Sequence, residues 1–167
     1  MKMPVLRQIE PEVQGEGLLA RLRAMYRRPV VYEVAENYRC FVTVAGRREL
    51  LLLPAGFRTD LASTPRISWA LGFRPDSPAL LLPGLWHDWY YRFGYYLGDG
   101  GRPLYRGRGR AFADREFAMQ VCRRSGLFGP AIVARLALWA GGWPAWKSNE
   151  KWRKAPYHKA LQGEYQD

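Results

Sequence analysis

The sequence predicts a small α+β domain in which a short antiparallel β-meander precedes three packed antiparallel helices. Apolar and β-branched runs separated by turns fill the first third of the chain, as is typical of strands. Helix-starting and helix-ending residues punctuate the rest. A chain of 167 residues, 48% hydrophobic and 14% aromatic, is long enough for one core and too apolar for general disorder. We expect a single domain over 28–146, between an N-terminal extension (1–27) and a basic polar tail (147–167).

Three strands make up the predicted meander, at 29–34, 38–44 and 48–53. Each run is β-branched or apolar, and the turns between them are Glu36-Asn37 and Ala45 to Arg47. Ahead of the strands, residues 17–26 have the pattern of a short amphipathic helix. Behind them, Ser63 and Pro65 begin a short helix with a cap and a first-turn proline.

The first long helix is expected from Asp76-Ser77-Pro78 to Tyr91. Asp76 or Ser77 can cap it, and a proline fits the first turn. Pro83-Gly84 should kink the helix or restart it just before His87. The aromatic residues at and just after its end are expected in the core, namely Trp86, Trp89, Tyr90 and Phe93.

The remaining segments alternate between loop and helix. A Gly/Arg-rich loop is expected at 98–110, a helix at 111–125 that ends at Gly126, and a third helix at 129–141. The tail from Lys147 is polar and basic, so we expect it to be loosely held.

Charge and cysteine content limit the classes of function. The net charge of +11 comes mostly from arginine and favours polyanionic partners, although a soluble basic protein from a GC-rich genome would have the same balance. Cys40 and Cys122 lie far apart in apolar segments and are expected as reduced core residues. We expect neither a signal peptide nor a membrane span, and hence expression in a bacterial cytoplasm.

Chemistry-bearing residues gather in two short motifs and one downstream pair. Residues 57–66 (FRTDLASTPR) contain Asp60, residues 86–91 (WHDWYY) contain His87 and Asp88, and Asp114 follows. Neighbouring residues on a helix point about 100° apart, so His87 and Asp88 should not pair with each other. His87 should instead face an antiparallel helix carrying Asp114, with Tyr91 one turn along on the same face. A carboxylate there would fix the imidazole tautomer and stabilise the imidazolium that forms when His87 takes a proton from water.

Asp60 and Asp88, with a backbone carbonyl near Leu61, would offer hard oxygen ligands. Such ligands suit calcium better than zinc. Structural readings stay open: Asp60 can cap its own turn, Asp114 can interact with a helix dipole, and His87 can be a packed core residue. A zinc peptidase is less favoured, because His158 is the only other histidine.

Two resemblances follow from these motifs. The order F-x-T-D-x-A-S-x-P-R, H-D-x-x-Y and A-D-x-x-F, over about residues 28–142, resembles a family of small phage and prophage proteins of unassigned function. That likeness implies a phage or prophage origin, among genes for tail or late virion functions, and no particular reaction.

The second resemblance concerns residues 87–91 and 114–117, which are similar to the active-site helices of phospholipase A2 enzymes, including bacterial and parvoviral forms. It implies that His87 is the general base, that Asp88 binds calcium, and that Tyr91 and Asp114 orient the base. The Asp60-Leu61 pair matches the upstream pair that completes the calcium site in bacterial forms. The chain departs from the family because it lacks the disulfides of the secreted enzymes and has no glycine between Arg58 and Pro65.

Three functions remain open on these grounds. The first is a virion- or tail-associated protein with a phospholipase A2-like site, whose partners would be other virion proteins. The second is an active calcium-dependent lipid or ester hydrolase that acts on anionic lipid of the host envelope. The third, less favoured, is a non-specific nucleic-acid binder that uses the 98–110 loop with Arg115, Arg123 and Arg124 on backbone phosphates. A structural network of His87, Asp60 and Asp114 would suit the first.

Overall fold

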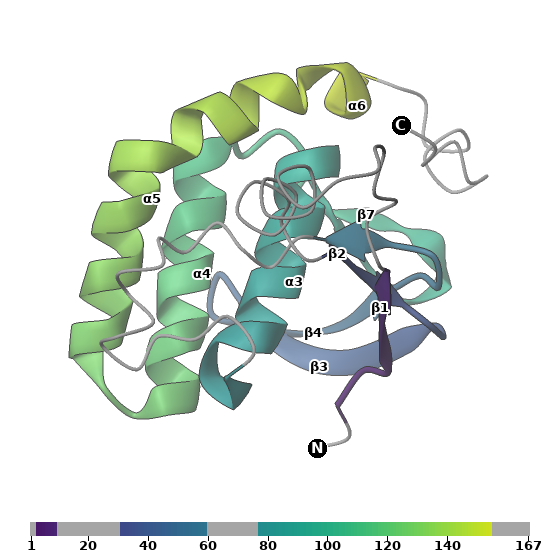
Figure 1. Ribbon diagram of the computed structural model, residues 1–167, viewed down its shortest axis with the longest axis horizontal. Helices are drawn as coiled ribbons and strands as arrows, with labels where there is room; N and C mark the ends of the chain where they lie inside the picture. The colour runs from purple at the N-terminus through teal and green to yellow at the C-terminus, as the bar shows by residue number, and fades with distance from the viewer. Residues whose placement is uncertain (1–2, 10–30, 60–76, 155–167) are drawn as a thin grey trace, which may run out of the picture.

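The computed structural model describes residues 3–9, 31–59 and 77–154 and confirms the α+β class. Short antiparallel strands lie beside α3, and α4 and α5 follow on its other side (Figure 1). The expected helix at 17–26 and the short helix at Ser63-Pro65 lie outside the described residues. The strands are β1 (Leu6–Ile9), β2 (Val31–Val34), β3 (Tyr38–Val44), β4 (Arg47–Leu53), β5 (Arg58–Thr59), β6 (Tyr96–Leu97) and β7 (Pro103–Leu104).

The meander is only partly as expected. β3 and β4 form the predicted antiparallel hairpin, whose two-residue turn Ala45-Gly46 has positive φ at both positions. β2 does not pair with β3; it lies between β1 and β5 in a separate sheet. Both edges of β2 are therefore occupied, and at its end the Val34 amide donates at 2.9 Å to the carbonyl of Phe57, the residue before β5. The sequence could not reveal this, because β1 is a short run that gives a weak strand signal.

The long helices are α3 (Pro78–Phe93), α4 (Arg110–Ser125) and α5 (Phe128–Ser148), with a short α6 (Glu150–Lys154) at the end. Neighbours among α3, α4 and α5 run antiparallel (Figure 1). α4 matches the prediction and ends at Gly126, which adopts the left-handed conformation. α3 does not restart at Pro83. The proline lies in the second turn, where its missing N–H removes a single intrahelical hydrogen bond.

The C-terminal part differs from the prediction. α5 continues past 141, through Gly141, Gly142 and Pro144, to Ser148. In the described part of the predicted tail, residues 147–148 end α5 and 150–154 form α6, with Asn149 as a turn between them. This part is held in place, because the Arg153 guanidinium donates to the Tyr91 carbonyl at 2.8 Å and lies 3.8 Å from the Trp146 ring centroid. The rest of the tail, 155–167, lies outside the described residues. The 98–110 segment is also more ordered than a loop: β6 and β7 pair around η1 (Asp99–Gly101), and Arg110 begins α4.

The core lies between the β3–β4 hairpin and α3. Alternate residues of β3 are buried, as the two-residue period of a strand requires. The aromatic residues of α3 are buried as expected, and Phe57 packs edge-on against Trp89 with ring centroids 5.1 Å apart. Both cysteines are free thiols; Cys40 is buried and Cys122 is half-buried. Within the described residues, no helix combines the length and apolarity needed to cross a membrane.

Candidate functional site

α3 carries the histidine and two of its partners. Ser77 precedes the helix in an extended conformation, Pro78 takes the first position, and Gly94 ends the helix in the left-handed conformation. His87 and Tyr91 are one turn apart on this helix, and their ring centroids are 4.1 Å apart. The expected shared face is confirmed.

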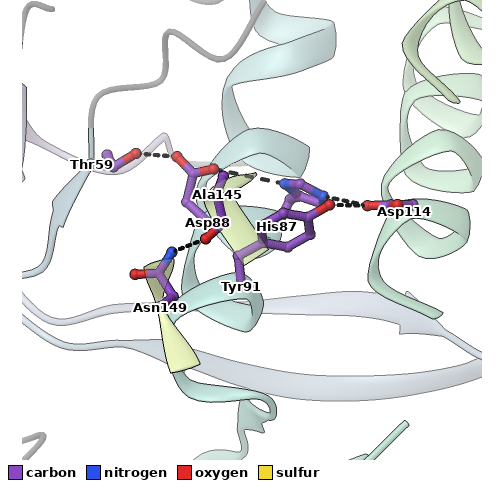
Figure 2. A network of polar contacts seen from close by, with 7 residues as sticks. All are labelled: Thr59, His87, Asp88, Tyr91, Asp114, Ala145 and Asn149. Carbon is purple, nitrogen blue, oxygen red and sulfur yellow. Dashed lines mark hydrogen bonds and ion pairs between the residues drawn. The ribbon is translucent and has the colours of Figure 1, made fainter. Parts of the chain in front are cut away.

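Asp114 faces His87 from the neighbouring helix, as predicted. His87 Nε2 lies 3.1 Å from Asp114 Oδ1, and the Tyr91 hydroxyl donates to the same oxygen at 2.5 Å (Figure 2). Asp114 is in the second turn of α4, so the antiparallel packing of α3 and α4 brings the three side chains together. All three are buried. One carboxylate oxygen thus holds both the imidazole and the phenol.

The other ring nitrogen faces Asp88. His87 Nδ1 lies 3.7 Å from Asp88 Oδ1, an ion-pair distance, so the expectation that these neighbours would not pair was wrong. Their Cβ atoms diverge, but the ring and the carboxylate extend far enough to approach each other. The Thr59 hydroxyl donates to Asp88 Oδ2 (Figure 2). Polar contacts therefore run from Thr59 at the end of β5, through Asp88 and His87, to Asp114.

Two functional partners were missed from the sequence. Arg110 Nε lies 3.8 Å from Asp114 Oδ2, and Arg110 Nη1 donates to the Leu138 carbonyl of α5 at 3.1 Å. The i, i+4 spacing of Arg110 and Asp114 was a usable signal. Because Arg110 is engaged inward, it is a poor ligand for the nucleic-acid phosphates considered for the 98–110 segment. Thr59 gave no signal beyond its position beside Asp60.

The pKa of His87 reflects two opposing causes. Burial lowers the pKa of the imidazole, but the hydrogen bond to Asp114 and the proximity of Asp88 outweigh it, so the pKa is raised above its ordinary value. Burial, and then the hydrogen bond to Asp114, raise the pKa of Tyr91. The Tyr91 phenol therefore stays protonated and remains a donor, and the imidazolium form of His87 is favoured between two carboxylates.

The calcium site predicted at Asp60, Leu61 and Asp88 is described only at Asp88. Asp60 and Leu61 lie outside the described residues. Over the described ranges, no group of three or more His, Cys, Asp or Glu side chains is arranged to hold a metal ion. Asp88 is partly exposed, and with Thr59 it offers carboxylate and hydroxyl oxygens, which are donors of the hard type that calcium takes.

Comparison with known proteins places the chain in a family. Searches of curated proteins and of solved structures give no match. A family model described as "Protein of unknown function (DUF1353)" matches residues 32–128. That region begins in β2 and ends at the start of α5, so it includes the described residues of the His87 site. The match covers more than half of the sequence, and the chain belongs to the DUF1353 family.

Proposed function

We propose that this protein is a hydrolase of the phospholipase A2 type, with His87 as the general base. The observation that carries the proposal is the 3.1 Å contact between His87 Nε2 and Asp114 Oδ1 across two antiparallel helices. That contact leaves Nδ1, which lies 3.7 Å from Asp88 Oδ1, as the nitrogen that would accept the proton of a water molecule. Asp114 fixes the tautomer and stabilises the imidazolium, and Tyr91 helps to hold Asp114 in place.

In the proposed reaction, His87 Nδ1 removes a proton from a water molecule. The water oxygen attacks the carbonyl carbon of an ester and forms a tetrahedral intermediate. When the intermediate collapses, the ester C–O bond breaks, and the leaving alkoxide takes the proton back from the imidazolium. The step needs no oxidant or reductant, and the histidine returns to its starting state.

Calcium is the proposed cofactor, held by Asp88 together with Asp60 and a carbonyl near Leu61. Bound calcium would polarise the ester carbonyl and hold a phosphate of the lipid. Asp88 then has two roles in this chain, as a calcium ligand and as the carboxylate nearest to Nδ1. The hydroxyl of Thr59, the residue before Asp60 in the sequence, donates to Asp88.

The proposed substrate is an ester of an anionic lipid, and the proposed setting is a phage or prophage protein associated with the virion or tail. The motif order in residues 57–66, 87–91 and 113–117 supports this setting. The net charge of +11 supports an anionic substrate surface.

The test is release of fatty acid from mixed anionic vesicles in calcium, by wild type and His87→Gln. We expect the substitution to lower the rate by about two to four orders of magnitude. The wild-type rate should rise with pH through the raised pKa of His87, because only neutral imidazole accepts a proton. A wild type that binds calcium and releases nothing from any lipid tested contradicts the proposal.

A second candidate is a non-enzymatic protein in which the same residues are a structural network. The burial of His87, whose side chain is 6% exposed, favours this candidate, as do the carboxylates facing both ring nitrogens. On this alternative, His87→Gln lowers the free energy of unfolding by about 1 to 3 kcal/mol. Fatty-acid release and thermal melting, measured on wild type and on His87→Gln, separate the candidates. The catalytic candidate predicts a wild-type activity that the variant loses, whereas the structural candidate predicts a lower melting temperature and no activity in either protein.

A further inference from the structure

α5 presents a continuous apolar stripe to solvent. Its large apolar side chains recur every three or four residues, which places them along one side of a helix. Their exposed fractions run from 58% to 76%. We call this stripe the α5 outer face; it consists of Phe128, Ile132, Leu136, Trp139 and Trp143.

The opposite side of α5 accounts for the helix's attachment to the protein. Ala131 and Gly142 are its buried residues, and half-buried Ala134 and Leu138 pack against the cluster of Leu80, Phe117 and Val121. Small residues let α5 approach α4 closely, so the packing of α5 on the protein does not use the side chains of the outer face. α5 lies at one edge of the molecule (Figure 1). A row of exposed large apolar side chains is unusual on a soluble monomer and marks an interaction surface.

Positive charge lies along and at both ends of the outer face. α5 contains no Asp or Glu, and its exposed charged residues are Arg135 and Lys147. Glu150, the acidic residue of α6, is paired with Lys154 at 2.6 Å. Apart from Lys154, the exposed basic residues near the two ends of α5 are Arg123 and Arg124 at its start and Lys151 at its end.

We propose that the α5 outer face binds the surface of an anionic lipid bilayer. An apolar helix face with tryptophans and flanking basic residues is the pattern of helices that lie in the plane of a membrane interface. Phe128 to Trp139 lie within 12 residues, about 17 Å of helix, ahead of the bend toward α6 that Figure 1 shows, so these side chains can contact the bilayer together. A second copy of this chain is a weaker match, because each copy carries a charge of +11 and the two would repel.

α5, which carries the outer face, also contacts residues of the His87 site. Gly142 lies directly against the Tyr91 hydroxyl, which donates to Asp114. The guanidinium of Arg110, next to Asp114, lies 5.9 Å from the ring centroid of Trp143. Binding through α5 would therefore hold the site near the lipid. The proposal does not rest on hydrolysis, because the face exists without any role for His87.

The test is cosedimentation of the full chain with vesicles in chelator. The vesicles are phosphatidylglycerol mixed with phosphatidylcholine, or phosphatidylcholine alone. We expect binding to the anionic vesicles that weakens as salt increases. The double variant Leu136→Gln/Trp139→Gln should bind at least about tenfold more weakly, since two apolar contacts are lost. Both side chains are exposed, so the variant should melt like wild type.

Two control variants sharpen the result. Phe41→Gln changes a side chain of similar exposure on β3, away from α5, and should bind like wild type. His87→Gln should also bind like wild type, which separates binding from catalysis. Equal binding of the double variant and wild type overturns the proposal, as does equal binding to both vesicle types. A wild-type dimer in solution that the double variant abolishes would overturn it in favour of a second copy.

Discussion

α3 and α5 are both long, apolar helices with an internal proline, yet they have opposite surroundings. α3 buries ten of its 16 residues, whereas α5 buries two of its 21. α3 lies between the strands and α4, while α5 lies at the edge of the molecule (Figure 1). Composition therefore makes both segments helical, but position in the fold decides whether an apolar face becomes core or surface.

The difference extends to polar residues. On α3, His87 is buried, so both ring nitrogens face carboxylates. On α5, Arg135 and Lys147 are exposed and need no partner from the protein. The energetic consequences should differ accordingly: changes in α3 should act on stability, and changes in the α5 outer face should act on binding.

The largest expected effect compares two leucines. Leu85 of α3 is fully buried, and Leu85→Ala should lower the free energy of unfolding by about 2 to 5 kcal/mol, because it removes apolar contacts and leaves a cavity. Leu136 of α5 is 60% exposed, and Leu136→Ala should change the free energy of unfolding by less than about 0.5 kcal/mol. Urea denaturation of the two variants measures both. Equal losses would mean that the α5 outer face is covered in the isolated protein.

The next effect concerns the buried carboxylate. Asp114→Asn should cost about 1 to 3 kcal/mol of unfolding free energy, because the amide keeps the shape but removes the charge beside His87 and Arg110. Asp99→Asn is the matched control, since Asp99 pairs with Arg39 on the surface with both side chains 55% exposed. The control should change stability by less than about 1 kcal/mol. Thermal melting that ranks the two variants the other way contradicts the network.

Much of the site was predictable from the sequence, because the relevant spacings are local. His87 and Tyr91 are four residues apart on one helix, and Asp114 lies near the start of the next long helix. Pro78 and Gly126 marked the start of the first of these helices and the end of the second in the sequence. Given two antiparallel helices, the facing of His87 and Asp114 follows.

The errors arose where long-range contacts decide the structure. β2 pairs with β1 and β5, and no local pattern identifies partners so distant in sequence. α5 continues past Gly141 because Gly142 fits against Tyr91 and Trp146 packs on α3, whereas glycine and proline locally predict an end. The contact of His87 with Asp88 depends on side-chain rotation, which a helical wheel does not represent.

Substitutions of two adjacent glycines in α5 should change the free energy of unfolding in opposite directions. A Cβ atom on Gly142 would lie 2.6 Å from the Tyr91 hydroxyl, so Gly142→Ala should cost about 1 to 3 kcal/mol by forcing α5 away from α3. A Cβ atom on Gly141 would meet nothing within 4 Å, so Gly141→Ala should add about 0.4 to 1 kcal/mol by reducing the entropy of the unfolded chain. Denaturant midpoints of the two variants check the signs. A stabilising Gly142→Ala would mean that α5 does not pack closely here.

The smallest effect is a pH dependence of the free energy of unfolding, which we expect from His87 of α3 and not from the α5 outer face. Burial lowers the pKa of His87, but the hydrogen bond to Asp114 and the charge of Asp88 outweigh it and raise the pKa above its unfolded value of about 6.5. The imidazolium thus binds its proton more tightly in the folded state. Its contribution to stability is complete below about pH 6.5 and is lost as pH rises through the folded pKa, with a slope of at most about 1.4 kcal/mol per pH unit for one proton. Unfolding free energies of wild type and His87→Gln, measured across that range, should converge as pH rises. The double variant of the α5 outer face should keep the wild-type slope, and a slope unchanged in His87→Gln would mean that another group titrates.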